Sequence, residues 1–206
     1  MLQQQLLSHS FVTEIEKGTL PLKRLQLFVL QDAWLVLHAT QIDALTIAKT
    51  TDKKLQQLLV QNFSSYKREG KDSLLLLGEG VGLSEKDFQN IMPLAGCMAL
   101  THFFYATLTY GTAIEAIFAI IASKEIFTKM CQRIGKGLQK NYHLSDEALT
   151  FFTAHDSVEG KIAPIKKYIE REYSLAKDKK SIAQAVSLSN QTELLFFDAI
   201  MHAPLS

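Results

Sequence analysis

The stretch that decides the fold reads FVTEIEKGTLPLKRLQLFVLQD, residues 11–32. Its first part is typical of a short helix that ends at Gly18, and Pro21 suits the first turn of the next helix. Within that second helix Asp32 lies in the run Leu27–Leu37, which is otherwise almost wholly apolar. Because removing a carboxylate from water is costly, a buried Asp32 needs a hydrogen-bond donor, either from the protein or from a ligand in a cavity.

Size and composition predict one globular domain over residues 1–206. Hydrophobic residues make up 47% of the chain and the formal net charge is +1, which argues against disorder. Nucleic-acid binding needs a concentrated basic surface, so the balanced charge predicts no nucleic-acid partner. The two cysteines, Cys97 and Cys131, fit a reduced cytoplasm better than a disulfide scaffold. We therefore expect a cytoplasmic protein.

One stretch is long enough to raise the question of a membrane. Residues 88–114 carry no formally charged side chain, and that length could span a bilayer. Pro93, Gly96, His102 and several threonines interrupt it, which favours a buried central helix over a transmembrane one. The N-terminus lacks the basic flank and long apolar core of a secretory signal. We expect no membrane partner.

The spacing of apolar residues is helical almost throughout, which predicts an all-α protein. Thr112 and Glu115 have the form of a capping box, and Asp52 and Ser145 suit helix N-caps. Long helices with short connectors indicate antiparallel neighbours in a bundle. The predicted helices span residues 2–17, 21–49, 52–81, 84–92, 94–110, 112–138, 145–155, 157–176 and 178–202.

Polar side chains on these apolar helices are the candidates for a binding pocket inside the bundle. Each has an ordinary alternative: a histidine in a core is usually a hydrogen-bonded structural residue, and a pair four residues apart on a helix is often exposed. A carboxylate among leucines and phenylalanines, however, is expensive unless it is used. The candidates are Asp32, His102, Tyr105, Ser123, Glu125, His155, Glu159 and Glu193.

The residues named above resemble a known family. Phe11-Val12, Gly18-Thr19-Leu20-Pro21 and Gln31-Asp32 resemble the opening of the TenA (thiaminase II) family, and the segment Glu193–Asp198 resembles its closing helix. The resemblance implies a haem-oxygenase-like helical bundle with a single domain. It also implies a buried pocket for a small-molecule ligand and a homo-oligomer, a dimer or tetramer. The same superfamily includes pyrroloquinoline-quinone synthase.

In TenA enzymes the residues that match Asp32 and Glu193 contact an aminopyrimidine. The family's cysteine nucleophile corresponds here to Ser123, a tyrosine four residues on corresponds to Phe127, and an aromatic residue corresponds to Leu35. The resemblance therefore implies a small-molecule-binding protein, or a hydrolase of an aminopyrimidine or related heteroaromatic metabolite that works without the cysteine, as in thiamine salvage. Such a protein needs no cofactor. Its implied catalytic residues are Glu193 and Glu125, and its implied substrate-binding residues are Asp32, His102, Tyr105 and Ser123.

Two alternatives stay open. Glu125, His155 and Glu159 resemble metal ligands of the oxidase branch related to the chlamydial death-domain-associating protein, although Ile162 stands where the last histidine belongs. Three such ligands could hold one iron or manganese ion, which predicts a metal-dependent oxidase with a reduced ligand shell. The second alternative is a non-catalytic binding or interaction protein that kept the bundle and lost the chemistry.

Overall fold

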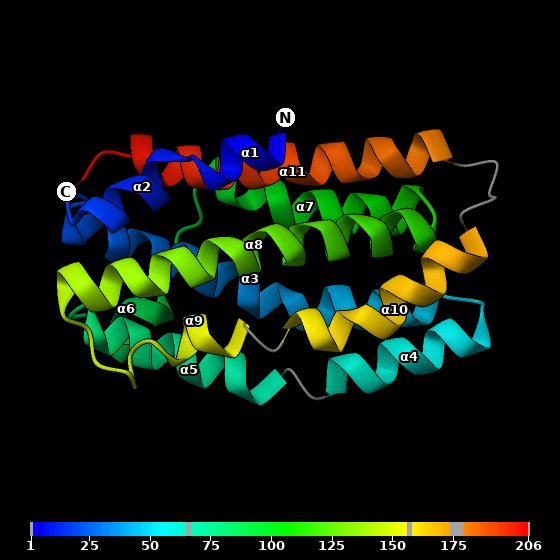
Figure 1. The fold of residues 1–206 in the computed structure, drawn as a ribbon, viewed down its shortest axis with the longest axis horizontal. Coiled ribbons are helices and arrows are strands. Elements are labelled where there is room, and N and C mark those ends of the chain that lie inside the picture. The colour runs from blue at the N-terminus through cyan, green and yellow to red at the C-terminus, as the bar shows by residue number, and fades with distance from the viewer. Residues whose placement is uncertain (1, 65–66, 156–157, 174–178, 206) are drawn as a thin grey trace.

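The computed structural model describes residues 2–64, 67–155, 158–173 and 179–205, and this part of the chain forms an elongated bundle of α-helices without strands (Figure 1). The all-α prediction is confirmed. The helices are α1 (Leu2–Leu7), α2 (Ser10–Lys17), α3 (Leu22–Lys49), α4 (Lys53–Ser64), α5 (Lys67–Gly80), α6 (Glu85–Gln89), α7 (Ala95–Tyr110), α8 (Ala113–Tyr142), α9 (Thr150–Ala154), α10 (Val158–Tyr173) and α11 (Lys179–His202).

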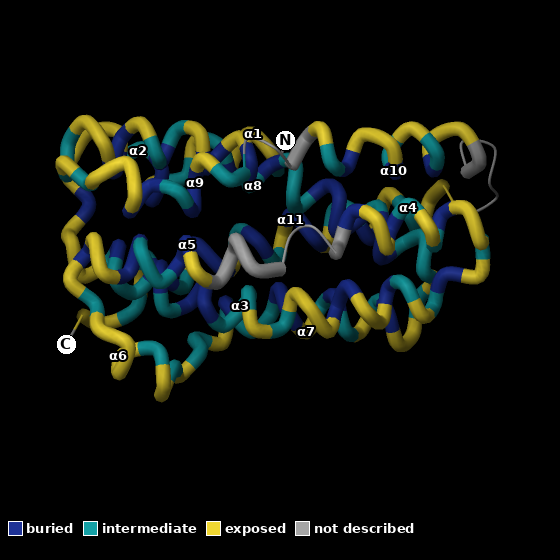
Figure 2. The backbone as a smooth tube through the Cα atoms, turned by 90° about the horizontal axis from the view of Figure 1, so that it is seen from below, coloured by how far each residue is buried: buried dark blue, intermediate teal, exposed yellow. Residues whose placement is uncertain are grey.

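Four long helices, α3, α7, α8 and α11, run along the long axis of the molecule (Figure 1). The last helix, α11, packs against α7 and α8, while α3 packs against α7 and α5. The short α1 and α2 cover α8 and α11, and the pairs α4–α10 and α5–α9 complete the other side. Buried positions follow the inner faces of these helices and exposed positions their outer faces (Figure 2). The interior between α3, α7, α8 and α11 is therefore where a secluded pocket can form.

The N-terminal segment forms two helices instead of the single predicted helix 2–17. The chain breaks before α2 because the side chain of His9 caps that helix: its Nδ1 accepts a hydrogen bond from the Phe11 N–H at 3.2 Å. The α2 helix then ends, as predicted, at Gly18, whose φ of 72° lies in the left-handed region that glycine adopts without strain.

The capping box at the start of α8 is confirmed, but the predicted end of this helix is wrong. The Thr112 N–H donates to Glu115 Oε2 at 2.7 Å and the Glu115 N–H donates to Thr112 Oγ1 at 3.3 Å. The helix continues to Tyr142, four residues beyond the predicted end at 138. Gly137 serves packing there rather than termination, because a Cβ at this position would lie 2.9 Å from Ile15 Cγ2 of α2.

Two other predicted boundaries differ from the structure. The segment predicted as a helix over residues 145–155 is helical only in α9, after turns in which Ser145 Oγ accepts from the Ala148 N–H at 3.2 Å. The predicted helix 52–81 corresponds to α4 and α5, and the residues between them, 65–66, lie outside the described part of the chain. Asp52 does cap α4, since its Oδ1 accepts from the N–H groups of Lys54 and Leu55 at 3.0 Å.

The uncharged stretch of residues 88–114 is divided among the end of α6, the 16-residue α7, the start of α8 and the two connections between them. In the described ranges, no helix has both the length and the apolar character needed to cross a membrane.

The hydrophobic core consists of three clusters. The largest is rich in phenylalanine and joins α2, α3, α9 and α11 through Phe11, Phe28, Phe152, Phe196 and Phe197. A second cluster holds α4, α8 and α10 together. The third lies between α3, α7, α8 and α11 and contains Ile42, Leu100, Phe104 and Ile120. The candidate site lies where the first cluster meets the third.

Candidate functional site

A cavity lies among α3, α7, α8 and α11, and each helix contributes one face to it. Its lining positions repeat at helical spacing, as in Ile120, Ser123, Lys124 and Phe127 on α8, because residues three and four apart share one face of a helix. The cavity has a volume of about 160 Å³, which is room for one planar ring with a short substituent. The complete lining is Leu35, Val36, Ala39, Ile42, Asp43, Leu100, Phe104, Ile120, Ser123, Lys124, Phe127, His155, Glu193, Phe196 and Phe197.

Glu193 of α11 is the main ionisable group in this wall. Its side chain is buried at 2% exposure, and its Oε2 accepts a hydrogen bond from the Ser123 hydroxyl at 2.9 Å. Burial raises the pKa of Glu193 to about 8, the Ser123 hydrogen bond acts in the opposite direction, and the nearby Asp32 charge raises the pKa again. At neutral pH this carboxyl is therefore mainly protonated and is able to donate a proton.

Asp32 of α3 is buried near enough to Glu193 for its charge to act on that carboxyl, but it does not line the cavity. Its exposure is 3%, and in the part of the chain that the structure describes no group donates a hydrogen bond to its carboxylate. Burial raises the pKa of Asp32 to about 7. Burial is the main cause that raises the pKa of the Cys97 thiol to about 12, and the Asp32 charge adds to that effect. Cys97 is thus a buried, unreactive thiol, and the two carboxyls form an acidic pair at one end of the cavity.

Asp43 and Lys124 line the cavity toward its other end, and the sequence-based site did not include them. Asp43 lies eleven residues after Asp32 on the same face of α3, a separation of about 16 Å along the helix. Burial lowers the pKa of Lys124, and the Asp43 charge opposes that effect. The sequence contains little signal for Lys124, because this lysine follows the apolar run of residues 116–122 between two other polar residues, Ser123 and Glu125, and not inside the run as Asp32 does.

His155, which the sequence assigns only as a metal ligand of the alternative oxidase, lines the cavity from the end of α9. Its Nδ1 lies 2.7 Å from the Phe151 carbonyl oxygen. Its ring meets Phe127 and Phe151 edge to face, with centroid distances of 5.1 and 5.0 Å. These contacts fix the ring as part of an aromatic wall.

The predicted metal ligands are not brought together in the described residues. Glu125 points away from the cavity toward α10, where Lys166 Nζ donates to its Oε1 at 2.5 Å. The physical reason is its position two residues after Ser123, about 200° further around α8. The side chain of Glu159 lies outside the described residues, and among those described no cluster of three or more metal-binding side chains occurs. The geometry does not fit a metal centre built on Glu125 and His155, so we derive no chemistry through one.

His102 and Tyr105, predicted to bind substrate, lie on the outer side of α7. His102 is exposed, and the Tyr105 hydroxyl donates to Gln41 Oε1 at 2.7 Å and lies 3.0 Å from His38 Nδ1. The structure therefore does not bring these two side chains to Glu193. Because α7 is apolar on nearly all sides, polarity alone does not identify its inner face, which Leu100 and Phe104 provide.

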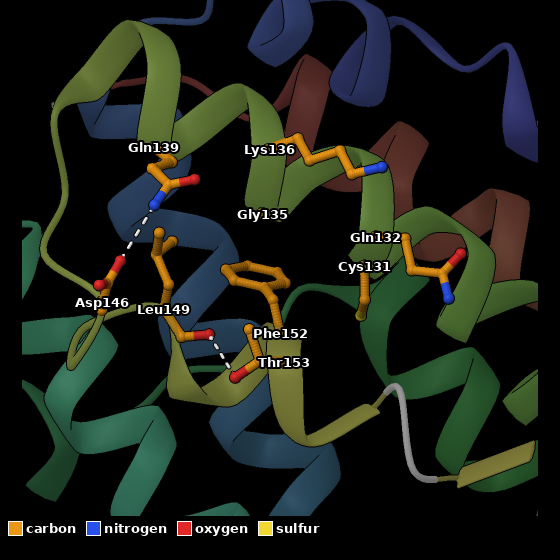
Figure 3. A pocket seen from close by; sticks show the side chains of 9 residues that line it. All are labelled: Cys131, Gln132, Gly135, Lys136, Gln139, Asp146, Leu149, Phe152 and Thr153. Atoms are coloured by element: carbon orange, nitrogen blue, oxygen red, sulfur yellow. Dashed lines mark hydrogen bonds between the residues drawn. The ribbon is translucent and has the colours of Figure 1, made fainter. Parts of the chain in front are cut away.

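A second hollow is larger but lies on the surface between α8 and the segment around α9 (Figure 3). Its volume is about 530 Å³, and most of its lining is exposed, including Gln132, Lys136 and Thr153. Gln139 Nε2 donates to Asp146 Oδ1 across one end at 3.0 Å. None of the predicted site residues lines it. We assign the candidate site to the smaller inner cavity because Glu193, a buried carboxyl with a raised pKa, lines it and the charge of the buried Asp32 acts on that carboxyl.

Comparison with known proteins gives a family match. The profile described as the TENA/THI-4/PQQC family matches residues 1–192. Among curated proteins, no sequence match was found.

Solved structures with the same architecture are numerous. A TenA homologue protein from P. horikoshii OT3 is similar over 97% of this chain and 92% of its own, with 18% identity and a TM-score of 0.77. A domain with a heme oxygenase-like fold from Shewanella denitrificans OS217 is similar over 97% of this chain and 87% of its own, with 14% identity and a TM-score of 0.78. A candidate TenA-like thiaminase from Sulfolobus solfataricus P2 is similar over 100% of this chain and 93% of its own, with 16% identity and a TM-score of 0.75. At these identities the likeness shows the fold, which is haem-oxygenase-like as predicted.

Proposed function

This chain belongs to the TENA/THI-4/PQQC family, and we propose that it binds an aminopyrimidine or a related small heteroaromatic amine in the inner cavity and hydrolyses a C–N bond of that ligand. The observation that carries the proposal is the buried Glu193 carboxyl, held by Ser123 at 2.9 Å in a wall otherwise dominated by aromatic and aliphatic side chains. Such a carboxyl needs a polar partner, and an aminopyrimidine supplies one.

The recognition chemistry is a match of donors and acceptors. An aminopyrimidine presents a ring nitrogen that accepts a hydrogen bond next to an amino group that donates one. A protonated Glu193 carboxyl donates to the ring nitrogen through its O–H and accepts from the amino group through its other oxygen. The rings of Phe104 and Phe196, both in the cavity lining, supply apolar faces for the planar ligand.

The same carboxyl provides the proton transfer that hydrolysis requires. As water attacks the carbon of a C–N bond, its oxygen forms the new bond to carbon and the electron pair of the broken bond leaves with nitrogen. The Glu193 carboxyl gives its proton to the leaving nitrogen, and the resulting carboxylate takes a proton from the water. A pKa of about 8 suits this exchange near neutral pH. In this scheme the Glu193 O–H holds the ring nitrogen on binding and turns to the leaving nitrogen for bond cleavage. Ser123, the polar group at the family's cysteine position, orients Glu193 rather than acting as the nucleophile.

Binding is tested by calorimetric titration with 4-amino-2-methylpyrimidine. We expect saturable binding to the wild-type protein and at least a tenfold weaker affinity in Glu193→Leu, because this variant removes both hydrogen bonds to the ligand and each is worth about 0.5 to 1.5 kcal/mol. Glu193→Gln is expected to retain most of the affinity, because its amide donates and accepts in the same pattern as the protonated carboxyl. Glu79→Leu, on the exposed surface of α5, is the matched control. The absence of binding at millimolar ligand, or equal affinity in Glu193→Leu, would contradict the proposal.

Hydrolysis is tested separately, by chromatography of aminopyrimidines that carry a cleavable C–N bond. The proposal predicts turnover that Glu193→Gln abolishes. Tight binding without any turnover would support the ligand site but contradict the proposed hydrolysis. That outcome is the one the non-catalytic alternative predicts.

A further inference from the structure

The outer face of α7 carries no charged side chain, and the candidate site does not explain this. The uncharged stretch of residues 88–114 includes all of α7. Leu100 and Phe104 on its inner face line the cavity, where apolar side chains are expected. Its outer face is exposed (Figure 2), and about 25 to 35% of the residues on a soluble surface are normally charged. The missing charge on this face therefore needs a second explanation.

The neighbouring helix α3 continues the uncharged surface. The two helices lie side by side and run in the same direction. The Leu94 N–H, just before α7, donates to Gln31 Oε1 of α3 at 2.8 Å. Lys49 Nζ, at the end of α3, donates to the Leu108 carbonyl oxygen near the end of α7 at 2.6 Å. Exposed positions three and four residues apart form one stripe on each helix, and we call the two stripes together the uncharged face. Its residues are Leu37, Gln41, Ala44, Leu45 and Ala48 of α3 and Ala95, His102, Ala106, Thr109 and Tyr110 of α7.

The outer sides of other long helices differ from the uncharged face. The exposed side of α4 carries Lys53, that of α8 carries Lys129 and Lys136, and that of α11 carries Asp198. Charged residues are depleted at the centre of protein–protein contacts, because a charge loses its hydration there. A surface that spans two helices without a charged side chain is therefore typical of a contact surface.

The absence of charge also indicates the partner. A partner that presented lysine or carboxylate side chains would have to desolvate them against a face with no charge to compensate them. A second copy of this chain presents the same uncharged face. In a two-fold contact the same patch meets itself, so a fixed charge near the axis would meet its own like charge, and a patch without charge avoids this repulsion. The uncharged face is thus complementary to itself.

The polar side chains at the centre of the face already bind one another. The Tyr105 hydroxyl, on α7, donates to Gln41 Oε1 at 2.7 Å and lies 3.0 Å from His38 Nδ1. Because the hydroxyl proton goes to Gln41, the His38 Nδ1–H is the donor of the second hydrogen bond. A second copy can cover these two hydrogen bonds without breaking either, which lowers the cost of burying the polar groups.

The shape of the face suits a two-fold contact. Tyr110 protrudes at the C-terminal end of α7 and is 89% exposed. Toward the start of α7, a groove of about 300 Å³ lies between α3, α5 and α6, with Leu37, Phe88 and Ile91 in its lining. A two-fold axis perpendicular to the face reverses the helices, so the protruding ring of one copy approaches the groove of the other. The helix pair measures about 24 Å by about 20 Å before the groove is added, which is on the scale of a small dimer contact.

We propose that the uncharged face is a two-fold contact between two copies of this chain, and that protonation of His38 and His102 separates the copies. His102 belongs to the face, and His38 lies at its centre between Tyr105 and the ring of Trp34, whose centroid is 4.5 Å from that of the imidazole. Neutral imidazoles fit a contact without charge. In the two-fold pair each histidine occurs twice, so protonation introduces like charges on both sides of the same contact.

The surroundings of His38 give the direction of the pH effect. Burial lowers its pKa below the ordinary value of 6.5, and the His102 charge lowers it again. A second copy that covers the ring lowers the pKa further, so association favours the neutral imidazole and weakens as the pH falls through that pKa. Among the other described titratable groups of α3 and its neighbours, the following do not contribute to this shift: Asp32, Asp43 and Lys49 of α3, Cys97 of α7, Asp72 and Glu79 of α5, and Glu193 of α11. We therefore expect the copies to associate at neutral pH and to separate below about pH 6.

The first test is sedimentation velocity of the full chain at pH 7.5 over a series of concentrations. We expect the mass of an even number of copies, and half that mass in Leu45→Glu, because a two-fold contact buries the introduced carboxylate twice. The dissociation constant should rise about a hundredfold or more. Leu45 is 46% exposed in the single chain, so its fold tolerates the substitution. Val60→Glu is the matched control, since Val60 is 48% exposed on α4, outside the face, and this variant should keep the full mass.

The second test repeats the measurement at pH 5. We expect the wild-type mass to fall by half and the double variant His38→Gln, His102→Gln to keep its full mass, because amides do not take up a proton in this range. His143→Asn is the control, since asparagine tolerates the left-handed backbone of this residue at the end of α8, and it should respond to pH as the wild type does. The buried carboxyls Asp32 and Glu193 make the folded chain more stable at pH 5 than at pH 8, so the loss of mass is not unfolding, which circular dichroism verifies.

The contact and its pH response can fail separately. A wild-type chain that stays monomeric at high micromolar concentration, as it would if the face received a different protein, would overturn the contact. So would a Leu45→Glu variant that keeps the wild-type mass. A wild-type mass that does not change between pH 7.5 and pH 5, or that falls equally in the double histidine variant, would overturn the role of His38 and His102.

Discussion

Ser123 and Glu193 are 70 residues apart in the chain, yet the Ser123 hydroxyl donates a hydrogen bond to Glu193 Oε2 over 2.9 Å. Ser123 comes from the middle of α8 and Glu193 from α11, two of the long helices that pack directly against each other. The bond connects a buried carboxyl to a neutral donor, so it orients the carboxyl without supplying a compensating charge. This arrangement keeps Glu193 available for a ligand.

Removing this hydroxyl is expected to raise the pKa of Glu193 further, because the Ser123 hydrogen bond is one of the influences that lower it. In Ser123→Ala the pH dependence of aminopyrimidine affinity should therefore shift to higher pH. Calorimetric titrations between pH 6 and 10 measure the midpoint. Ser187→Ala is the control, since that hydroxyl only accepts from Gln191 Nε2 near the surface of α11. A midpoint that stays in place or moves to lower pH would contradict the assigned role of Ser123.

The two buried carboxyls predict how stability depends on pH. The pKa of Glu193 rises from 4.5 to about 8 on folding, and that of Asp32 from 3.8 to about 7. Across these intervals the folded protein binds more protons than the unfolded chain, so the free energy of unfolding falls as the pH rises from about 4 to 8. Glu193→Gln should flatten this decline and stabilise the protein at pH 8.5 by on the order of 2 to 4 kcal/mol. Urea denaturation at a series of pH values measures the free energy of unfolding of both proteins. A free energy that falls more steeply with pH in the variant than in the wild type would contradict the burial of the Glu193 charge.

The sequence assigns Glu125 a catalytic or metal-binding role, whereas the structure places it in an ion pair that faces away from the cavity. It pairs with Lys166, and the two side chains are 29% and 40% exposed. Because solvent screens such a pair, Glu125→Gln should change the free energy of unfolding by less than about 1 kcal/mol and leave aminopyrimidine affinity within about twofold of the wild type. A tenfold loss of affinity would show that Glu125 serves the cavity after all.

Replacing glycine by alanine is expected to change stability in opposite directions at two helical positions, Gly96 and Gly160. A Cβ at Gly96 of α7 would lie 2.5 Å from the Leu195 carbonyl oxygen of α11, so Gly96→Ala must push these helices apart. We expect a loss of about 2 kcal/mol or more. Gly160 of α10 has no atom within 4 Å of the equivalent position, and Gly160→Ala should stabilise the helix by about 0.5 to 1 kcal/mol. Thermal unfolding of both variants checks the pair, and equal shifts would contradict the close packing of α7 on α11.

The fold was largely predictable because its signals are local. Helical spacing of apolar residues, the left-handed Gly18 and the capping box at Thr112 each act within a few residues, and all three appear as expected. The errors arose where tertiary contacts decide. Gly137 looks like a helix end in sequence but allows α2 to pack closely on α8, and His9 divides an otherwise continuous helical pattern.

The site was predictable only in part, because a site depends on which face of each helix turns inward. Asp32 and Glu193 were found from the cost of burying a carboxylate, and both are buried next to each other. The same rule cannot place a polar residue on a helix such as α7, where apolar side chains surround it, so His102 was assigned to the interior although it is exposed. The rule did not select Lys124, because it stands between Ser123 and Glu125 at the end of an apolar run. The roles of these residues in binding and catalysis stay predictions.

The central claim is that the inner cavity, and not the surface hollow between α8 and α9, receives a planar heteroaromatic amine. A crystal structure of the protein with 4-amino-2-methylpyrimidine tests it most directly. The account predicts electron density for the ring among Phe104, Phe127 and Phe196, with the ring nitrogen and the amino group within hydrogen-bond distance of Glu193. Density for the ligand at Gln132 and Lys136, or an inner cavity that holds only water at saturating ligand, would contradict it.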